Sequence, residues 1–125
     1  MDHVIGVDLG GTQIRAVRAD MEGKIEERRA VLTLAAQGPH AVLDRMRSLV
    51  ASVWGNGAVQ AIAVGVPGPT DPYRGVLLVG PNLPGWREVD ITQEIGGHFG
   101  IPTYVGNDAN LAGLAEYRFG AGRGF

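Results

Sequence analysis

A pair of glycines between two strand-like runs near the N-terminus constrains this chain most. Val4, Ile5, Val7 and Leu9 form an apolar run rich in β-branched side chains, as a buried strand requires, and residues 13–16 alternate between polar and apolar. The pair Gly10-Gly11 therefore joins strand to strand and predicts a hairpin. Dinucleotide and Walker-type phosphate loops need a helix after their glycines, so this stretch matches neither pattern.

The predicted hairpin has the donors of an anion site. Gly10 and Gly11 carry no Cβ, so their backbone N–H groups can approach phosphate oxygens, and the Thr12 hydroxyl is a further donor. Asp8 beside them could hold Mg²⁺ through water. A plain hairpin also explains these residues, because Gly-Gly is a favoured two-residue connection and Asp is a common turn residue.

The composition of the chain excludes several classes of protein. The 125 residues are 45% hydrophobic, which suits one domain with a core, and the net charge of -2 gives no basic field for nucleic acid. The absence of cysteine excludes disulfides and thiolate zinc sites within the chain. No apolar run approaches the ~20 residues of a membrane span, and the N-terminus has no signal-peptide pattern. We therefore expect a cytoplasmic protein with no nucleic-acid or membrane partner.

The order of the remaining elements predicts an α/β fold. After the hairpin we expect a turn at 20–23, a third strand over 24–34, a helix from Gly38-Pro39 to Gly55, and a buried strand over 59–66. Then follow a proline-rich loop over 67–72, a short strand over 76–79 and a second loop over 80–86. The last expected elements are a short helix from Asp90 to Phe99, a strand over 102–105, and a helix from 106 to about 119. The predicted sheet is mixed, with three antiparallel strands followed by parallel strands and flanking helices. The tail over 120–125 has no periodicity. The three histidines are far apart in sequence, and each is expected at the surface.

Asn107 and Asp108 follow a predicted strand and open a predicted helix, a position where α/β sheets tend to build ligand sites. The helix dipole would keep the Asp108 carboxylate ionised. Such a carboxylate can orient a sugar hydroxyl and accept its proton during phosphoryl transfer. Asn and Asp are also the commonest N-cap residues, so one of the two could simply cap the helix.

Four stretches in order are similar to motifs of one family. Asp-Leu-Gly-Gly-Thr-Gln-Ile at 8–14 resembles the first phosphate motif, Asp-x-Gly-Gly-Thr, of sugar kinases of the ROK family (repressor, open reading frame, kinase) in the actin-like ATPase superfamily. Residues 65–69 resemble that family's Gly-x-Pro-Gly loop, and residues 82–86 its Asn-Leu-Pro-Gly-Trp sugar loop. Residues 107–110, with Glu116, resemble its Asn-Asp-Ala-Asn motif. Gly106 departs from the family, where many members have Glu, and this leaves the identity of the substrate more open than the reaction.

The resemblance implies roles for particular residues. Asp108 would be the catalytic base for the 6-hydroxyl of a hexose, glucose above all, and the substrate-binding set would be Gly68, Asn82, Asn107 and Asp108. The cofactors implied are ATP and Mg²⁺. The residues approaching the ATP phosphates would be Asp8, Gly10, Gly11, Thr12 and Gln13, with Asp8 holding Mg²⁺ through water.

The second half of such a kinase has no counterpart in this sequence. In the family, the second phosphate loop, the adenosine pocket, the Glu-x-x-His sugar contacts and the structural zinc motif belong to a C-terminal lobe. We therefore expect residues 1–119 to be an N-terminal lobe and residues 120–125 to begin the connection to that absent lobe, with a homodimer or self-association through the exposed inter-lobe face. Two alternatives are the sugar-sensing lobe of a ROK-family transcriptional regulator and an inactive free-standing lobe. The regulators carry a helix-turn-helix before the first strand, whereas here that strand is expected to begin within a few residues of Met1.

Overall fold

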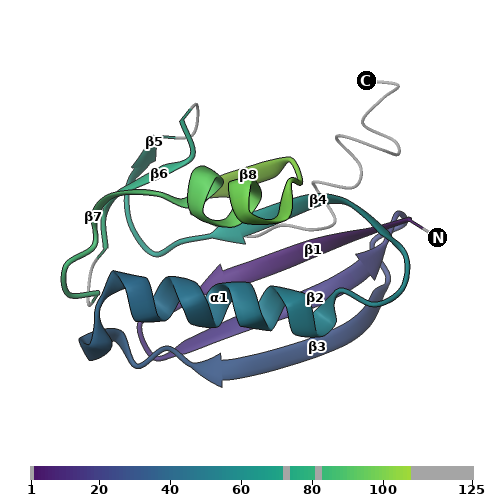
Figure 1. Ribbon diagram of the computed structural model, residues 1–125, viewed down its shortest axis with the longest axis horizontal. Helices are drawn as coiled ribbons and strands as arrows, with labels where there is room; N and C mark the ends of the chain where they lie inside the picture. Colours follow the sequence, from purple (N-terminus) through teal and green to yellow (C-terminus); the bar gives the residue numbers. More distant parts are fainter. Residues whose placement is uncertain (1, 72–73, 81–82, 108–125) are drawn as a thin grey trace.

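A five-stranded mixed sheet with helices on one face forms the centre of the molecule (Figure 1). The structure is a computed structural model that describes residues 2–71, 74–80 and 83–107. In chain order its elements are β1 (Asp2–Leu9), β2 (Gln13–Asp20), β3 (Ile25–Leu32), the 3₁₀ turn η1 (Ala35–Gln37), α1 (Pro39–Val53), β4 (Ala58–Gly65), β5 (Thr70–Asp71), β6 (Val76–Val79), β7 (Arg87–Asp90), the π-helical segment η2 (Thr92–Gly97) and β8 (Thr103–Gly106). The mixed α/β sheet expected from the sequence is confirmed, and the helix predicted over 106–119 lies outside the described residues, apart from its first two positions.

The strand order of the main sheet is β3-β2-β1-β4-β8. The first three strands pair antiparallel, and β4 runs parallel to both β1 and β8. Helix α1 connects the edge strand β3 to β4, as a parallel crossover requires, and packs over β2 and β3 (Figure 1). The carboxyl ends of β1, β4 and β8 therefore meet at one edge of the sheet.

Alternation along the strands divides the core between two faces. In β1, Ile5, Val7 and Leu9 belong to the large cluster beneath α1, whereas Val4 belongs to a small cluster with Ala19 and Ala61 on the opposite face. The buried positions of α1 recur at helical spacing, namely Val42, Leu43, Met46, Leu49, Val50 and Val53. Pro39 occupies the first turn of this helix, as predicted. Among the described residues, no helix is both long and apolar enough to cross a membrane.

Three features differ from the sequence-based expectations. Thr70 and Asp71, placed in a proline-rich loop, form the edge strand β5 of a second antiparallel sheet with β6 and β7; an edge position tolerates neighbouring prolines, which lack an N–H. The strand β7 was not predicted. His3 is not at the surface but 6% exposed, with its Nδ1 2.7 Å from Glu26 Oε1. The expected helix at 91–99 is present, and Asp90 Oδ1 accepts from the Gln93 N–H (2.9 Å) as its predicted capping residue.

Gly75 makes the tightest approach in the small sheet. Its φ is +69°, its carbonyl accepts from the N–H groups of Ile91 and Thr92, and an added Cβ would lie 1.6 Å from Thr92 Oγ1. Gly75→Ala is therefore expected to destabilise the chain by about 2–4 kcal/mol, from a strained φ plus steric overlap. Gly100→Ala is the matched control, because Gly100 has a similar φ of +68° and open space around its Cβ position; it should cost about 1–2 kcal/mol. Equal urea midpoints for the two variants would contradict the overlap.

Candidate functional site

Three parallel strands end side by side at the edge where ligand sites form in α/β sheets. Asp8, the second-last residue of β1, pairs with Gly65 at the end of β4, and Gly65 pairs with Gly106 at the end of β8. This register places the hairpin after β1, the loop after β4 and Asn107 after β8 along one edge. The structure thus brings together the predicted site residues that it describes. Asn82 and Asp108 lie outside the described residues.

The glycine hairpin has a defined internal geometry. The Gly10 N–H donates to the Gln13 carbonyl oxygen (3.0 Å), and an added Cβ at Gly10 would lie 2.8 Å from that same oxygen. Gly10 is therefore required by the turn itself, in addition to any role in approaching an anion. Gly11 and Thr12 are exposed, and their N–H groups donate to no group among the described residues. Two adjacent backbone donors are thus available to a ligand at the edge of the sheet.

Asp8 is exposed and lies on the sheet face opposite α1, directly across from Arg15 on β2. Within the part of the chain that the structure describes, no group of three or more His, Cys, Asp or Glu side chains could hold a metal ion. Asp8 is a single carboxylate, and Mg²⁺ is usually bound through one or two carboxylates together with water and ligand phosphates. Gln13, the last residue of the hairpin, accepts from Arg15 Nε through its side-chain oxygen (3.1 Å).

The loop after β4 is tied to the end of β8. Asn107 Nδ2 donates to the Gly68 carbonyl oxygen (2.6 Å), and the Val66 N–H donates to the Gly106 carbonyl oxygen (2.9 Å). Gly68 is buried, whereas Asn107 is exposed. Two residues predicted from separate motifs, 39 positions apart in sequence, are therefore in direct contact. The amide nitrogen of Asn107 serves this contact, and its Oδ1 accepts from no donor among the described residues.

Thr33 and Arg45 also belong to this region, and sequence reasoning missed them. Thr33 follows β3, is fully buried, and donates its hydroxyl to the Gly10 carbonyl oxygen (2.7 Å). Arg45 on α1 is half-buried, and its Nη1 donates to the Thr33 carbonyl oxygen (2.8 Å). No local signal could have found Thr33, because threonine is an ordinary strand residue and its partner lies 23 positions away.

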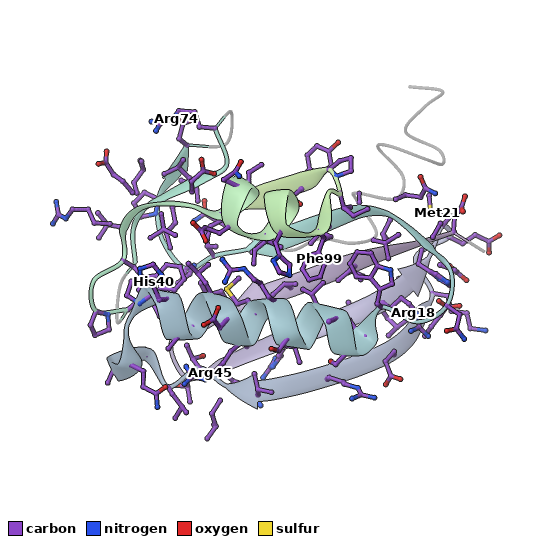
Figure 2. The ribbon with its side chains drawn as sticks, viewed as in Figure 1. Arg18, Met21, His40, Arg45, Arg74 and Phe99 are labelled. Atoms are coloured by element: carbon purple, nitrogen blue, oxygen red, sulfur yellow. The ribbon has the colours of Figure 1, made fainter. Side chains whose placement is uncertain are left out.

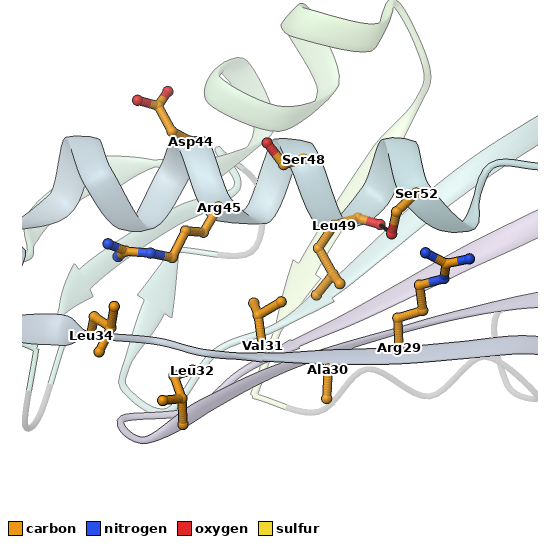
Figure 3. A pocket seen from close by; sticks show the side chains of 10 residues that line it. All are labelled: Arg29, Ala30, Val31, Leu32, Leu34, Asp44, Arg45, Ser48, Leu49 and Ser52. Carbon is orange, nitrogen blue, oxygen red and sulfur yellow. Dashed lines mark hydrogen bonds between the residues drawn. The ribbon is translucent and has the colours of Figure 1, made fainter.

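A groove of about 920 Å³ runs between β3 and α1 (Figure 3). Its walls are lined by Arg29, Ala30, Val31, Leu32, Leu34, Asp44, Arg45, Ser48, Leu49 and Ser52. None of the predicted site residues is among them. The groove is therefore separate from the site at the strand ends, although Arg45 lies at one of its ends above Leu34 (Figure 3).

Comparison with known proteins assigns the family. The model of the ROK family matches residues 4–125. The chain belongs to the ROK family. The resemblance carried by the four motifs is thereby confirmed.

Individual relatives of this ROK chain include kinases and a repressor. It is 35% identical to a glucokinase of Streptomyces coelicolor over 124 residues, 99% of the chain and 38% of that protein. It superposes on a ROK glucokinase of Streptomyces griseus, solved in complex with glucose and AMPPNP, with a TM-score of 0.78 and 37% identity, covering 98% of this chain and 38% of the other. A putative xylose repressor of a Caldicellulosiruptor strain is 29% identical over 122 residues, 94% of the chain and 30% of that protein. The chain thus spans about two fifths of the length of the two glucokinases.

Proposed function

We propose that this chain is the N-terminal lobe of an ATP-dependent hexose kinase of glucokinase type, with an actin-like ATPase fold. The observation that carries the proposal is the edge where β1, β4 and β8 end, because it places the exposed hairpin amides beside the linked pair Gly68 and Asn107. A phosphate-binding loop and a hydroxyl-binding loop at one edge are what transfer between a nucleotide and a sugar requires.

The hairpin is the proposed phosphate-binding element. The free N–H groups of Gly11 and Thr12 and the Thr12 hydroxyl would donate to ATP phosphate oxygens, with Gly10 fixing the turn and Gln13 closing it. The Asp8 carboxylate would bind Mg²⁺ through water. Bound Mg²⁺ would neutralise charge on the phosphates during transfer.

The segments that follow β4 and β8 are proposed sugar-binding elements. Gly68 would line the sugar pocket, and Asn82 and Asn107 would bind ring hydroxyls. Asp108, adjacent to Asn107, would be the general base: as the sugar 6-oxygen forms a bond to the γ-phosphorus, its proton passes to the carboxylate, the bond from that phosphorus to the bridging oxygen breaks, and ADP leaves. Glucose is the proposed hexose because both glucokinase relatives share about a third of their residues with this chain.

The proposed domain assignment takes account of the greater length of the glucokinase relatives. Residues 1–119 would form the lobe, and residues 120–125 would begin the connection to a C-terminal lobe that completes the nucleotide cleft. The chain covers only 38% of each of the two glucokinase relatives, which supports a longer complete protein. The proposed complete protein is therefore the object of the kinetic experiments below.

Glucose-dependent formation of ADP by the complete protein tests the proposal. We expect glucose 6-phosphate as the product, and we expect Asn82→Ala to raise KM for glucose about tenfold with a smaller change in kcat, because a ring-hydroxyl contact is present in both the ground and transition states. Arg74→Ala is a suitable control, since Arg74 is an exposed residue of the small sheet. Glucose binding without any ADP formation would instead favour the sugar-sensing alternative.

A further inference from the structure

All three polar groups of Thr33 are used to fix the glycine hairpin to its surroundings. The Thr33 hydroxyl donates to the Gly10 carbonyl oxygen (2.7 Å), and the Thr33 N–H donates to the Thr12 carbonyl oxygen (2.9 Å). The Thr33 carbonyl oxygen accepts from Arg45 Nη1 (2.8 Å). The side chain has no exposed surface. Thr33 therefore contacts the hairpin on both sides of Gly11, the residue at its tip.

Arg45 anchors this contact to α1. Figures 2 and 3 show Arg45 extending from the helix toward the segment that follows β3. Its Nη2 also donates to Gln37 Oε1 in η1, so the guanidinium joins two positions of the same connection. Leu34, which follows Thr33, has a φ of +51°, a left-handed conformation that is strained for leucine. Such a conformation persists where surrounding contacts determine it, and the contacts of Thr33 and Arg45 do so here.

The two hydrogen bonds to the hairpin leave its central donors unused. Thr33 occupies the carbonyl oxygens of Gly10 and Thr12, whereas the N–H groups of Gly11 and Thr12 donate to no described residue. Holding the carbonyl oxygens on the protein side restricts how the peptide units can rotate. The Gly11 N–H belongs to the same peptide unit as the Gly10 carbonyl, and the Thr12 N–H belongs to the unit between the two that Thr33 holds. Both N–H groups are thereby restricted in orientation before any ligand arrives, which lowers the cost of ordering them on binding.

We propose that Thr33 is a positioning residue for nucleotide binding, which orients the Gly11 and Thr12 amides toward the phosphates through its hydrogen bonds to the hairpin. This role rests on the kinase function proposed above. Thr33 itself is buried and touches no substrate. Loss of Thr33 should therefore change KM for ATP and not KM for glucose, because the hairpin faces the nucleotide whereas the sugar loop depends on Gly68 and Asn107.

Thr33→Val is the direct test in the complete kinase. Valine keeps the shape of threonine and removes the hydroxyl, which leaves the half-buried Gly10 carbonyl oxygen without its donor. We expect KM for ATP to rise about tenfold, equivalent to about 1.4 kcal/mol, with KM for glucose within about twofold of wild type. Thr33→Ser retains the hydroxyl and should restore KM for ATP to within about threefold of wild type.

Thr103→Val is the control for loss of a threonine hydroxyl that donates to a backbone carbonyl oxygen, here at a half-buried position. Thr103 Oγ1 likewise donates to a backbone carbonyl oxygen, that of Ile101 (3.0 Å), but at the start of β8, which is level with Ile5 in the middle of β1 rather than with the hairpin. Its thermal midpoint should fall by an amount similar to that of Thr33→Val, while KM for ATP stays unchanged. A general loss of stability would change KM for ATP in both variants alike. A positioning role predicts that KM for ATP rises only in Thr33→Val.

The outcomes distinguish this inference from the proposed function. A wild-type protein without glucose-dependent ADP formation would refute the kinase function itself. An active wild type in which Thr33→Val leaves KM for ATP unchanged, or raises both KM values equally, would refute the positioning role. If Thr33→Val does not fold, Arg45→Gln is the deciding variant. It removes the hydrogen bond from the half-buried Arg45 side chain to the Thr33 carbonyl oxygen. We expect a selective rise of about threefold in KM for ATP, and no rise would overturn the proposal.

Discussion

Asp108→Asn is expected to lower kcat of the complete kinase about 100-fold or more while leaving its affinity for glucose close to wild type. Asparagine keeps the shape of aspartate and most of its hydrogen bonds but has no basic oxygen, so the proton of the attacking hydroxyl loses its acceptor. An interaction needed only as the proton moves affects kcat, whereas one present in the ground state also affects KM. Steady-state kinetics with glucose and ATP, together with the thermal midpoint, measure both effects.

The competing explanation for Asp108 is a helix cap, and it makes a different forecast. Asn caps a helix as well as Asp does, so a capping role alone leaves both turnover and stability near wild type. Asp90→Asn is the matched control, because Asp90 accepts from the Gln93 N–H (2.9 Å) in a capping contact and is not one of the proposed site residues. That variant should retain normal kcat. Near-normal turnover by Asp108→Asn would end the assignment of Asp108 as the base.

The parts of the site predicted from sequence are those whose signal is local. Gly10-Gly11 between two strand-like runs specifies a hairpin, and the structure joins β1 to β2 there. Pro39 and the apolar positions from Val42 to Val53 specify a helix through a first-turn preference and a spacing of three to four residues. These patterns depend only on neighbours along the chain, so one sequence suffices to read them.

The contacts that hold the site together depend on pairing between distant strands. Asp8, Gly65 and Gly106 share one edge because β1 pairs with β4 and β4 with β8, and register across a crossover has no local signature. His3 was wrongly expected at the surface, and the contact of Arg45 was missed, for the same reason. Each is polar in sequence, yet His3 lies against Glu26 and Arg45 donates to the Thr33 carbonyl oxygen, partners supplied by tertiary structure.

The strand β5 shows a different limit of sequence reasoning. Prolines at 67, 69 and 72 argue against a strand, and the residues between them were assigned to a loop. Thr70 and Asp71 nonetheless pair with Leu77 and Val76, and the Leu78 N–H donates to the Pro69 carbonyl oxygen (2.9 Å). A proline still accepts through its carbonyl oxygen, so a proline-flanked segment can serve as an edge strand.

The isolated 125-residue chain is expected to have no detectable kinase activity, even where the complete protein turns over glucose. Its described residues supply one edge of the proposed cleft, namely the hairpin amides and the pair Gly68 and Asn107. Without the second wall, ATP has no adenosine contacts and water is not excluded from the phosphates. Positioning and a preorganised electrostatic environment account for most of the rate of phosphoryl transfer, so their loss removes the reaction rather than slowing it slightly.

A coupled assay for ADP with millimolar glucose and ATP measures this prediction, with the complete protein as the positive control. Trace activity from a contaminating host kinase is recognised by preparing the isolated chain as Asp108→Asn, since a contaminant is unaffected by that change. ATP-dependent phosphorylation of glucose that is present in the isolated wild-type chain and lost in its Asp108→Asn variant would show that one lobe suffices. In that case Asp108 would remain the base, and the requirement for a second lobe, which follows from a cleft with two walls, would be wrong.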